Sequence, residues 1–429
     1  MKQYLNPDKK EWRKILARPV IDASALSEKV KEILDEIRRD GAAALQKYAR
    51  LFDGATLDNF RVSKEEIEDA CANLDNELKS AIVKASANIR LFHEKQIFDY
   101  KKIETAPGVT CWQKAVPIEK VGLYIPGGTA PLFSTVLMLG IPAQIAGCKE
   151  IVLCTPPDKT GKINPAILFA ASVVGTTCIF KLGGVQAIGA MAYGVGDIPK
   201  VDKIFGPGNQ YVTAAKQLVS LHDVSIDMPA GPSEVAVMAD ETAIPEFVAS
   251  DMLSQAEHGT DSQVVLLANS SKIVDQVQQA IDSQLEKISR KDIASTVLNN
   301  STMIVLDDKE EMIEIINEYA PEHLIISMKD PSYIADRITN AGSVFLGNYT
   351  PESAGDYASG TNHTLPTNGW ARSYSGVDLD SFLKKITFQE ISREGLLALG
   401  PTIEVMAAGE QLDAHKNAVS LRMTYNEPS

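Results

Sequence analysis

The chain has 429 residues, of which 45% are hydrophobic and 23% are charged. This length predicts two or more domains, and the composition is that of an ordinary globular protein. Acidic residues outnumber basic ones by 56 to 42, and the net charge of −14 argues against nucleic acid or an anionic membrane as a partner. No apolar run approaches the roughly 18 residues of a membrane span, and residues 1–20 lack the apolar core of a secretory signal.

The cysteines are scattered along the chain and form no CxxC pair. Their odd number and their spacing predict reduced thiols in a cytoplasmic protein. Two of them lie inside apolar runs, where we interpret them as core residues. The five are Cys71, Cys111, Cys148, Cys154 and Cys178, of which Cys154 and Cys178 are the two in apolar runs.

The N-terminal quarter reads as a short arm followed by helices. A stripe of apolar residues from Leu26 to Ile37 predicts a helix that stops at Gly41. Ser63 and Glu66 form a capping-box signature for a second helix. Further apolar spacing from Leu74 to Ile89 predicts a longer helical region.

From Val121 onward, short strands alternate with helices, which predicts βαβ units and parallel sheets. The pattern indicates two α/β layers of similar design. Predicted strands are 121–125, 151–155, 178–182, 201–205, 234–239, 264–268, 303–306, 324–327 and 343–346. Predicted helices include 132–146, 165–174, 185–193, 210–221 and 245–257. Residues 348–377 read as a long loop, and long loops inside compact proteins are usually functional.

The end of the predicted helix 245–257 carries a pair of polar groups. Gln255 and His258 are three residues apart, so one helix face presents both, close to the stop at Gly259. These groups either hold a metal or form a polar helix end that faces water. Asp356, flanked by glycines in the long loop, either binds a metal or a hydroxyl or caps its own turn.

Glu322 and His323 are adjacent at the start of a predicted strand. A regular strand would point them to opposite faces, so joint action on one substrate requires the strand-entry turn that Pro321 makes plausible. A carboxylate and an imidazole can then divide proton transfers, one activating water and the other accepting a substrate proton. The alternative is a solvated strand start. Of the remaining histidines, His93 and His222 lie beside charged residues and are expected at the surface.

Three glycine-bearing turns follow successive predicted strands, namely 124–128, 182–186 and 206–209. Carboxyl ends of parallel strands share one edge of a sheet, which is where α/β proteins bind ligands. The turn before the helix at 210 could also offer backbone amides to a phosphate. None of these turns is GxGxxG, so tight structural turns remain the alternative to a nucleotide site.

Several longer motifs, taken in order, resemble one known family. They are GLYIPGG, GGVQAI, GPGNQYV, DMPAGPSE, SQAEHG, PEHL and GDYASGTNHTLPT, with Glu410 and His415 in the tail. This combination is similar to the histidinol dehydrogenase family over essentially the whole chain. The resemblance implies oxidation of L-histidinol to L-histidine through the aldehyde, with two NAD consumed. It also implies a homodimer of subunits with two incomplete Rossmann-like domains, small terminal helical pieces and shared active sites.

The resemblance also implies roles for individual residues. Glu322 would activate water and His323 would act as the general base. Zinc would be held by Gln255, His258, Asp356 and His415. The substrate would contact Ser233, Gln255, His258, His323, Asp356, Glu410 and His415, and NAD would contact Tyr124, Gln186 and Asn209.

With this resemblance we divide the chain into four parts. They are an arm at 1–21, a main α/β domain of 22–123 with 234–377, a second α/β domain at 124–233, and a helical tail at 378–429 that reaches the partner subunit. Three alternatives remain open: a dehydrogenase for another hydroxylated substrate, a zinc hydrolase that uses the same Glu–His–metal groups, and a non-catalytic nucleotide-binding protein.

Overall fold

The structure is a computed structural model that describes residues 1–18, 23–57, 59–127, 130–176, 178–229 and 231–425. The chain divides into two units. The larger one comprises Met1–Gln96 with Ile118–Phe382, and the smaller one comprises Ile97–Pro117 with the residues from Leu383 onward. The larger unit contains two parallel sheets, each with helices on both faces, and we refer to these two halves as the six-stranded and the five-stranded lobe.

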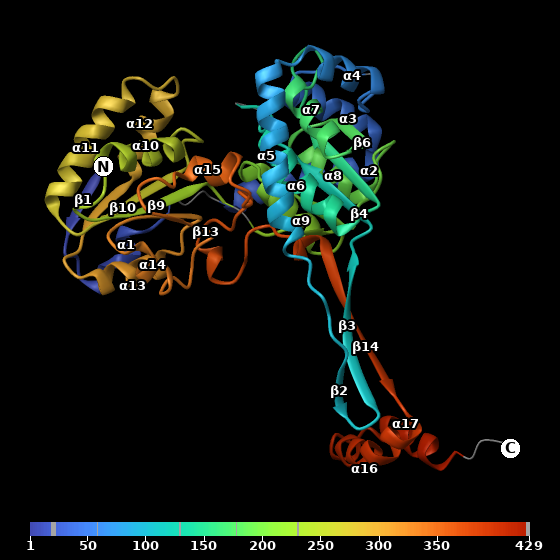
Figure 1. Cartoon of the computed structure of the whole chain (residues 1–429). Helices are drawn as coiled ribbons and strands as arrows, with labels where there is room; N and C mark the ends of the chain where they lie inside the picture. The colour runs from blue at the N-terminus through green and yellow to red at the C-terminus, as the bar shows by residue number, and fades with distance from the viewer. Residues whose placement is uncertain (19–22, 58, 128–129, 177, 230, 426–429) are drawn as a thin grey trace. The chain divides into compact units, whose positions relative to one another are not determined.

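The six-stranded lobe is built on buried apolar strands. The strands β9 (EVAVMA) and β10 (QVVLLA) are buried along their whole length, as expected for parallel strands covered on both sides. In spatial order the sheet contains β1 (Lys2–Leu5), β11 (Thr302–Val305), β10 (Gln263–Ala268), β9 (Glu234–Ala239), β12 (His323–Ser327) and β13 (Ser343–Leu346). One face packs on α10 (Pro245–Ala256), α11 (Ser271–Leu285) and α12 (Lys291–Asn300). The other packs on α1 (Trp12–Ile15), α13 (Lys309–Tyr319) and α14 (Pro331–Ala335), as Figure 1 shows.

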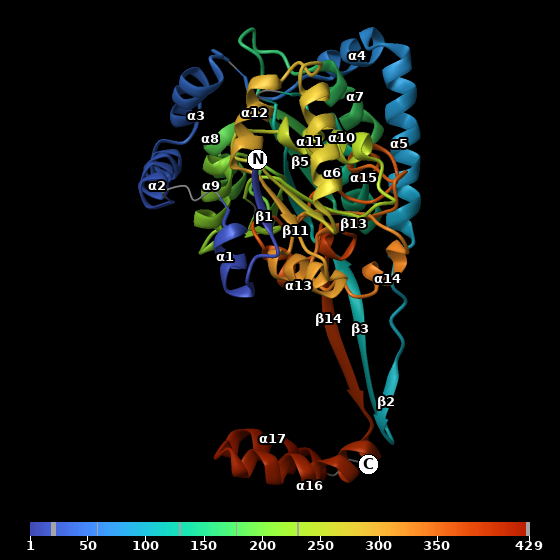
Figure 2. The ribbon, with the colours of Figure 1, turned by 90° about the vertical axis from the view of Figure 1, so that its left-hand side faces the viewer.

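The five-stranded lobe has the order β6 (Cys178–Lys181), β5 (Glu150–Thr155), β4 (Lys120–Tyr124), β7 (Lys203–Phe205) and β8 (Ser225–Ile226). One face packs on α2 (Ala23–Asp40), α3 (Ala42–Tyr48), α8 (Gly184–Tyr193) and α9 (Gln210–Ser220). The other packs on α4 (Lys64–Asn73), α5 (Asn76–Glu94), α6 (Phe133–Ala146) and α7 (Pro165–Val173), and Figure 2 shows the two helical layers on opposite sides. The chain runs from β4 outward to β6 and then returns to β7 on the other side of β4. The strand order therefore reverses between β4 and β7, where open α/β sheets bind ligands.

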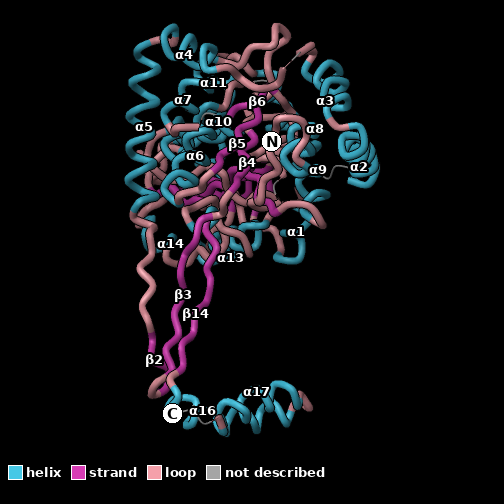
Figure 3. Tube along the Cα trace, turned by 90° about the vertical axis from the view of Figure 1, so that its right-hand side faces the viewer, coloured by secondary structure: helices cyan, strands magenta, loops and turns pink. Residues whose placement is uncertain are grey.

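The smaller unit is a three-stranded antiparallel sheet followed by two helices. Its strands are β14 (Leu383–Ile391), β3 (Val109–Pro117) and β2 (Ile103–Ala106), followed by α16 (Arg393–Gly409) and α17 (Asp413–Thr424), seen in Figure 3. Trp112 and Phe388 stack across β3 and β14 with ring centroids 5.5 Å apart. Gly400 lets α17 pack closely on α16, because a Cβ there would meet the Met423 sulfur.

Most predicted elements of the two lobes are confirmed. Helix α2 ends at Asp40, before Gly41 at φ +56°, and the Ser63–Glu66 capping box is present. His222 is exposed as expected. The predicted turn at 124–128 extends to Gly128, which lies outside the described residues.

Four expectations need correction. The arm supplies an edge strand, since β1 pairs with β11. The tail is not wholly helical, because β14 pairs with β3 along nine residues. The long loop contains α15 (Glu352–Tyr357), which packs against α10. His93, expected at the surface, is buried, and its Nδ1 lies 2.8 Å from Gln96 Oε1.

The packing of the N-terminal helices also differs from the grouping that we predicted. Residues 22–123 were grouped with 234–377, but α2 to α5 pack on the five-stranded sheet, and β2 and β3 belong to the smaller unit. The reason is that apolar stripes define which face of a helix is buried without defining the sheet that covers it. Among the described residues, no helix is both long enough and apolar enough to cross a membrane.

Candidate active site

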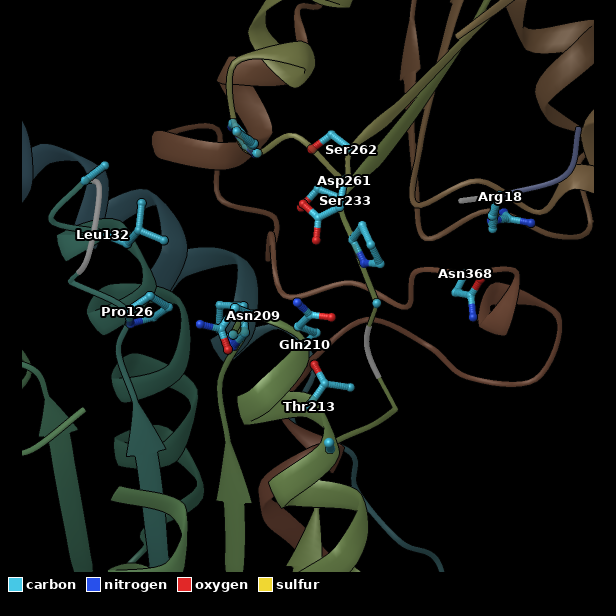
Figure 4. A pocket seen from close by; sticks show the side chains of 18 of the residues that line it. Arg18, Pro126, Leu132, Asn209, Gln210, Thr213, Ser233, Asp261, Ser262 and Asn368 are labelled. Carbon is cyan, nitrogen blue, oxygen red and sulfur yellow. The ribbon is translucent and has the colours of Figure 1, made fainter. Parts of the chain in front are cut away.

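A cavity of about 810 Å³ lies between the two lobes of the larger unit. The five-stranded lobe contributes Asn209 and the start of α9, and the six-stranded lobe contributes Ser233, His258 and Asp261. Figure 4 shows the labelled side chains of Asn209, Gln210, Ser233 and Asp261 in the cavity wall. The carboxyl ends of β4 and β7 therefore face the segments that precede β9 and follow α10. The cavity thus has Asn209, predicted at the cofactor site, on one side and His258, predicted as a metal ligand, on the other.

The predicted proton-transfer pair, Glu322 and His323, lies at the amino end of β12. His323 begins the strand and Glu322 precedes it, and both residues are buried. The side chains meet because the strand geometry starts only at His323, and Glu322 Oε2 lies 3.8 Å from His323 Nδ1. The strand-entry geometry that joint action requires is therefore present.

The carboxylate of Glu322 is held by the neighbouring strand. Its Oε2 accepts a hydrogen bond from the backbone N–H of Glu234 at 2.9 Å. The Glu234 carboxylate in turn accepts hydrogen bonds from the Arg18 guanidinium, with Nε to Oε2 at 2.6 Å, and from Asn368 N. Arg18, at the end of the N-terminal arm, therefore braces the strand that positions Glu322.

Two further carboxylates surround the His323 imidazole. Nε2 lies 3.4 Å from Asp356 Oδ1, and Nδ1 lies 3.5 Å from Glu352 Oε1. Both residues come from α15, one turn apart, so the helix places one carboxylate on each side of the ring. Sequence reasoning missed Glu352, whose spacing of four residues before Asp356 was a usable signal only once a helix was known there.

Burial and charge shift the acid–base properties of this cluster. Burial raises the pKa of Glu322 to about 8. Burial alone would lower the pKa of His323, but the charges of Glu352, Glu322 and Asp356 raise it to about 10. Burial also raises the pKa of Glu352, whereas the hydrogen bond and charge of His323 outweigh burial and lower the pKa of Asp356. The cluster therefore holds protons that can be exchanged with a bound molecule.

Gln255 and His258 come together at the end of α10. Gln255 Nε2 lies 3.5 Å from His258 Nδ1. The Gln255 Oε1 atom is buried and has no hydrogen-bond partner among the described residues. Desolvation lowers the pKa of His258, which favours the neutral imidazole that a metal requires.

The loop after Asp356 links the two lobes. His363 Nδ1 lies 2.9 Å from the backbone oxygen of Asp356, and His363 Nε2 lies 3.0 Å from Thr135 Oγ1 on α6. Asn88 on α5 also donates a hydrogen bond to the backbone oxygen of Ala358. Helices of the five-stranded lobe thus support the loop that follows Asp356, a connection that no local sequence pattern indicated.

The residues predicted at the cofactor site lie on the switch-point edge of the five-stranded sheet. Tyr124 ends β4, and its hydroxyl accepts a hydrogen bond from Gly184 N at 3.1 Å. Gln186 is buried in the first turn of α8. Asn209 caps α9, with its Oδ1 accepting hydrogen bonds from the backbone N–H groups of Tyr211 and Val212.

Glu410 and His415 belong to the smaller unit. Glu410 is the C-cap residue just after α16, in the turn before α17, as we expected from the spacing of Glu410 and His415. His415 lies on α17, and both side chains are exposed in this unit. Their participation in the site stays a prediction.

The fold and the site together define a two-lobed α/β enzyme. A buried acid–base cluster lies in one lobe, and the switch-point edge of a parallel sheet lies in the other. The chain belongs to the histidinol dehydrogenase family, whose model matches residues 16–423, and it is therefore an oxidoreductase.

Individual relatives agree over nearly the full length. A histidinol dehydrogenase of Bacteroides fragilis is 62% identical over 423 residues, which is 99% of each chain. That of Escherichia coli K12 is 52% identical over 416 residues, covering 96% of this chain and 95% of the relative. The crystal structure of histidinol dehydrogenase from Elizabethkingia anophelis superimposes with a TM-score of 0.96 at 56% identity, covering 99% of this chain and 98% of that one.

Proposed function

We propose that the protein oxidises L-histidinol to L-histidine through L-histidinal, with two molecules of NAD as hydride acceptors. The observation that carries this proposal is the contact of buried Glu322 with His323, together with the 3.4 Å approach of His323 to Asp356. A hydrolase needs no sheet-edge cofactor site, and membership of an oxidoreductase family favours the dehydrogenase. The direct test is reduction of NAD by purified protein supplied with L-histidinol, compared with other amino alcohols. Faster turnover of another amino alcohol would favour a related substrate.

His323 and Glu322 each accept a proton in a different one of the two oxidations. In the first, the neutral form of His323 accepts the hydroxyl proton at Nε2 while the carbon that bears this hydroxyl loses a hydride, so the alcohol becomes the aldehyde. Because the surrounding carboxylates raise the pKa of His323 to about 10, this neutral form becomes more populated as the pH rises above neutrality. In the second, Glu322 accepts a proton from the water that adds to the aldehyde, and the hydrate loses a second hydride to give the acid. Burial raises the pKa of Glu322 to about 8, so its ionised carboxylate is a stronger base than an exposed glutamate and becomes the major form only above that pH.

We propose that a zinc ion binds donor atoms of the larger unit. Gln255 and Asp356 offer oxygens and His258 offers a nitrogen, and the proposal is supported by the buried Gln255 Oε1, which has no hydrogen-bond partner among the described residues. His323, Glu352 and Asp356 form an alternative donor set within 4.8 Å, but His323 is needed as the base. Bound zinc would supply a positive charge that orients the substrate imidazole and amine. Ser233, at the cavity wall, would contact the same substrate.

Removal of metal tests the zinc assignment. A chelator should abolish turnover and leave the fold largely intact, and added zinc should restore activity. Full turnover in a sample shown by elemental analysis to be metal-free would contradict the assignment. His258→Ala should reduce the zinc content of the purified protein, whereas His222→Ala, an exposed histidine elsewhere, should not.

We further propose that Glu410 and His415 complete the site of a partner subunit in a homodimer. Their exposure within the smaller unit supports this proposal, since both side chains are available to another chain. Chains carrying His258→Ala and chains carrying His415→Ala are each expected to be inactive. Mixed under conditions that exchange subunits, they should regain activity, because one site of each mixed dimer then carries no lesion. If the mixture has no activity although mass spectrometry detects mixed dimers, the shared site is contradicted.

We also propose that the protein is cytoplasmic, and its unpaired cysteines support this location. All five cysteines are free thiols in the structure, and Cys154 is buried in the core of the five-stranded lobe. Burial raises the pKa of Cys154 to a value at which the thiol stays protonated and unreactive at neutral pH.

A further inference from the structure

Asp53 reaches the cofactor edge of the five-stranded sheet from a distant part of the chain. It ends a short helical turn, Ala49–Asp53, that follows α3. Its Oδ2 accepts a hydrogen bond from Gln186 Nε2 at 3.1 Å, and its carboxylate also accepts one from the backbone N–H of Gly183. Gly183 has no space for a side chain, because a Cβ would lie 2.8 Å from Asp53 Oδ1 and 2.6 Å from Pro156 Cβ.

These contacts determine which way the Gln186 amide points. Two N–H donors converge on Asp53, so its carboxylate serves as acceptor and must face the NH₂ end of Gln186. The Gln186 Oε1 atom therefore points the other way. It lies beside Gly184, where a Cβ would be 3.1 Å from it, and it is buried without a hydrogen-bond partner among the described residues. An unpaired buried oxygen of this kind costs free energy unless a ligand supplies a donor.

Tyr124 provides the opposite polarity at the same place. Its hydroxyl oxygen accepts the Gly184 N–H, so the hydroxyl proton is left to be donated. Gly184 has φ +58°, and this left-handed turn brings the Tyr124 hydroxyl and the Gln186 oxygen to the same residue. One donor and one acceptor thus lie side by side at the first turn of α8.

The carboxylate of Asp53 also occupies the amino end of α8. The amino end of a helix in an α/β sheet commonly receives a ligand phosphate, but Asp53 already binds the Gly183 N–H there. A second anion at this point would be repelled. The diphosphate of a dinucleotide is therefore excluded from the amino end of α8. The part of the dinucleotide that contacts α8 must then be an uncharged edge.

We infer that Asp53 is a positioning residue that turns the Gln186 oxygen toward the cofactor. Gln186 and Tyr124 then recognise an edge with an amino group beside an acceptor atom. This inference rests on the proposed use of NAD. Two edges of NAD have this chemistry: the carboxamide of the nicotinamide, and the amino group and N1 of the adenine.

Asp53→Asn is the informative change because it keeps the size and reverses the polarity. The amide oxygen of the substituted side chain would accept the Gly183 N–H, so its NH₂ group would face Gln186 and draw the Gln186 oxygen toward itself. Gln186 would then offer NH₂ to the cofactor. Loss of one such hydrogen bond, at about 1.4 kcal/mol, corresponds to roughly tenfold weaker NAD binding. Asp40→Asn, an exposed carboxylate of the same N-terminal region, is the matched control and should bind NAD as the natural protein does.

Two dinucleotides distinguish the edges. Nicotinamide hypoxanthine dinucleotide lacks the adenine amino group and carries N1–H, and 3-acetylpyridine adenine dinucleotide lacks the carboxamide NH₂. The dissociation constant of each is measured by titration on the whole zinc-containing protein. Asp53→Asn should raise the dissociation constant of NAD. It should also lower the ratio of the dissociation constant of one analogue to that of NAD, and the analogue for which this ratio falls identifies the edge of NAD that Gln186 contacts. Tyr124→Phe, which removes the hydroxyl donor, should lower the same ratio of dissociation constants. This variant is used if Asp53→Asn does not fold.

Three results would overturn the inference, and they separate it from the proposed function. If Gln186→Ala weakens NAD binding and Asp53→Asn does not, the positioning role is wrong while the NAD site stands. If Asp53→Asn weakens all three dinucleotides equally, its role is structural only. If neither Gln186→Ala nor Tyr124→Phe changes NAD binding, the proposed cofactor site itself fails.

Discussion

A buried ion pair behind the proposed cofactor edge offers a test of how the glycine turn before α9 is held. Lys216 and Asp227 form this pair, and their side chains are 4% and 1% exposed. Lys216 Nζ donates a hydrogen bond to Gly206 O at 2.8 Å, and Asp227 Oδ2 accepts one from Gly206 N at 2.9 Å. Gly206, at φ +128°, lies so close to β4 that a Cβ would be 2.1 Å from the Tyr124 carbonyl oxygen. The pair therefore holds both peptide groups of the residue that starts the turn.

Lys216→Met should destabilise the protein strongly. Methionine keeps the unbranched shape and removes the charge, so Asp227 is left as a buried carboxylate without its cation. Removal of one partner from a buried pair costs roughly 3–5 kcal/mol. Asp227→Asn added to Lys216→Met removes the stranded charge and keeps an oxygen for the Gly206 N–H. The double variant should therefore recover most of the lost stability.

Urea unfolding followed by far-UV circular dichroism measures these changes as shifts of the transition midpoint. Lys149→Met is the control, because Lys149 forms an exposed ion pair with Glu119 and such pairs contribute little. An unchanged midpoint for Lys216→Met would refute the reasoning. So would a double variant that is no more stable than Lys216→Met alone.

Two further predictions concern Glu322 and His93. Glu322→Gln keeps an acceptor for the Glu234 N–H but cannot take a proton, so single-turnover oxidation of supplied histidinal should slow more than the first hydride transfer from histidinol. Equal losses in both half-reactions would argue against separate roles. Burial lowers the pKa of His93 from 6.5, so unfolded chains bind more protons there, and the stability that neutral His93 contributes should fall as the pH drops below about 6.5. His93→Gln should show a shallower loss of unfolding free energy on acidification, and an unchanged slope would contradict this reading.

The presence of two α/β layers and most of their strands could be predicted from sequence, because local patterns specify them. Continuous apolar runs such as 234–239 and 264–268 specify strands buried on both faces. Glycine turns after successive strands indicated the proposed ligand-binding edge, and the spacing of Gln255 and His258 placed both at one helix end. Each of these features depends on residues within a few positions of one another.

Tertiary structure decided the rest, because it depends on segments that meet from distant parts of the chain. Strand β14 mixes apolar and polar residues and is almost wholly exposed, and it pairs with β3, more than 260 residues earlier. Glu352 becomes part of the His323 cluster because α15 packs on α10, and Asp53 meets Gln186 because α3 packs on α8. A carboxylate in the sequence shows its charge, but its neighbours, and therefore its pKa and its role, are set by long-range packing.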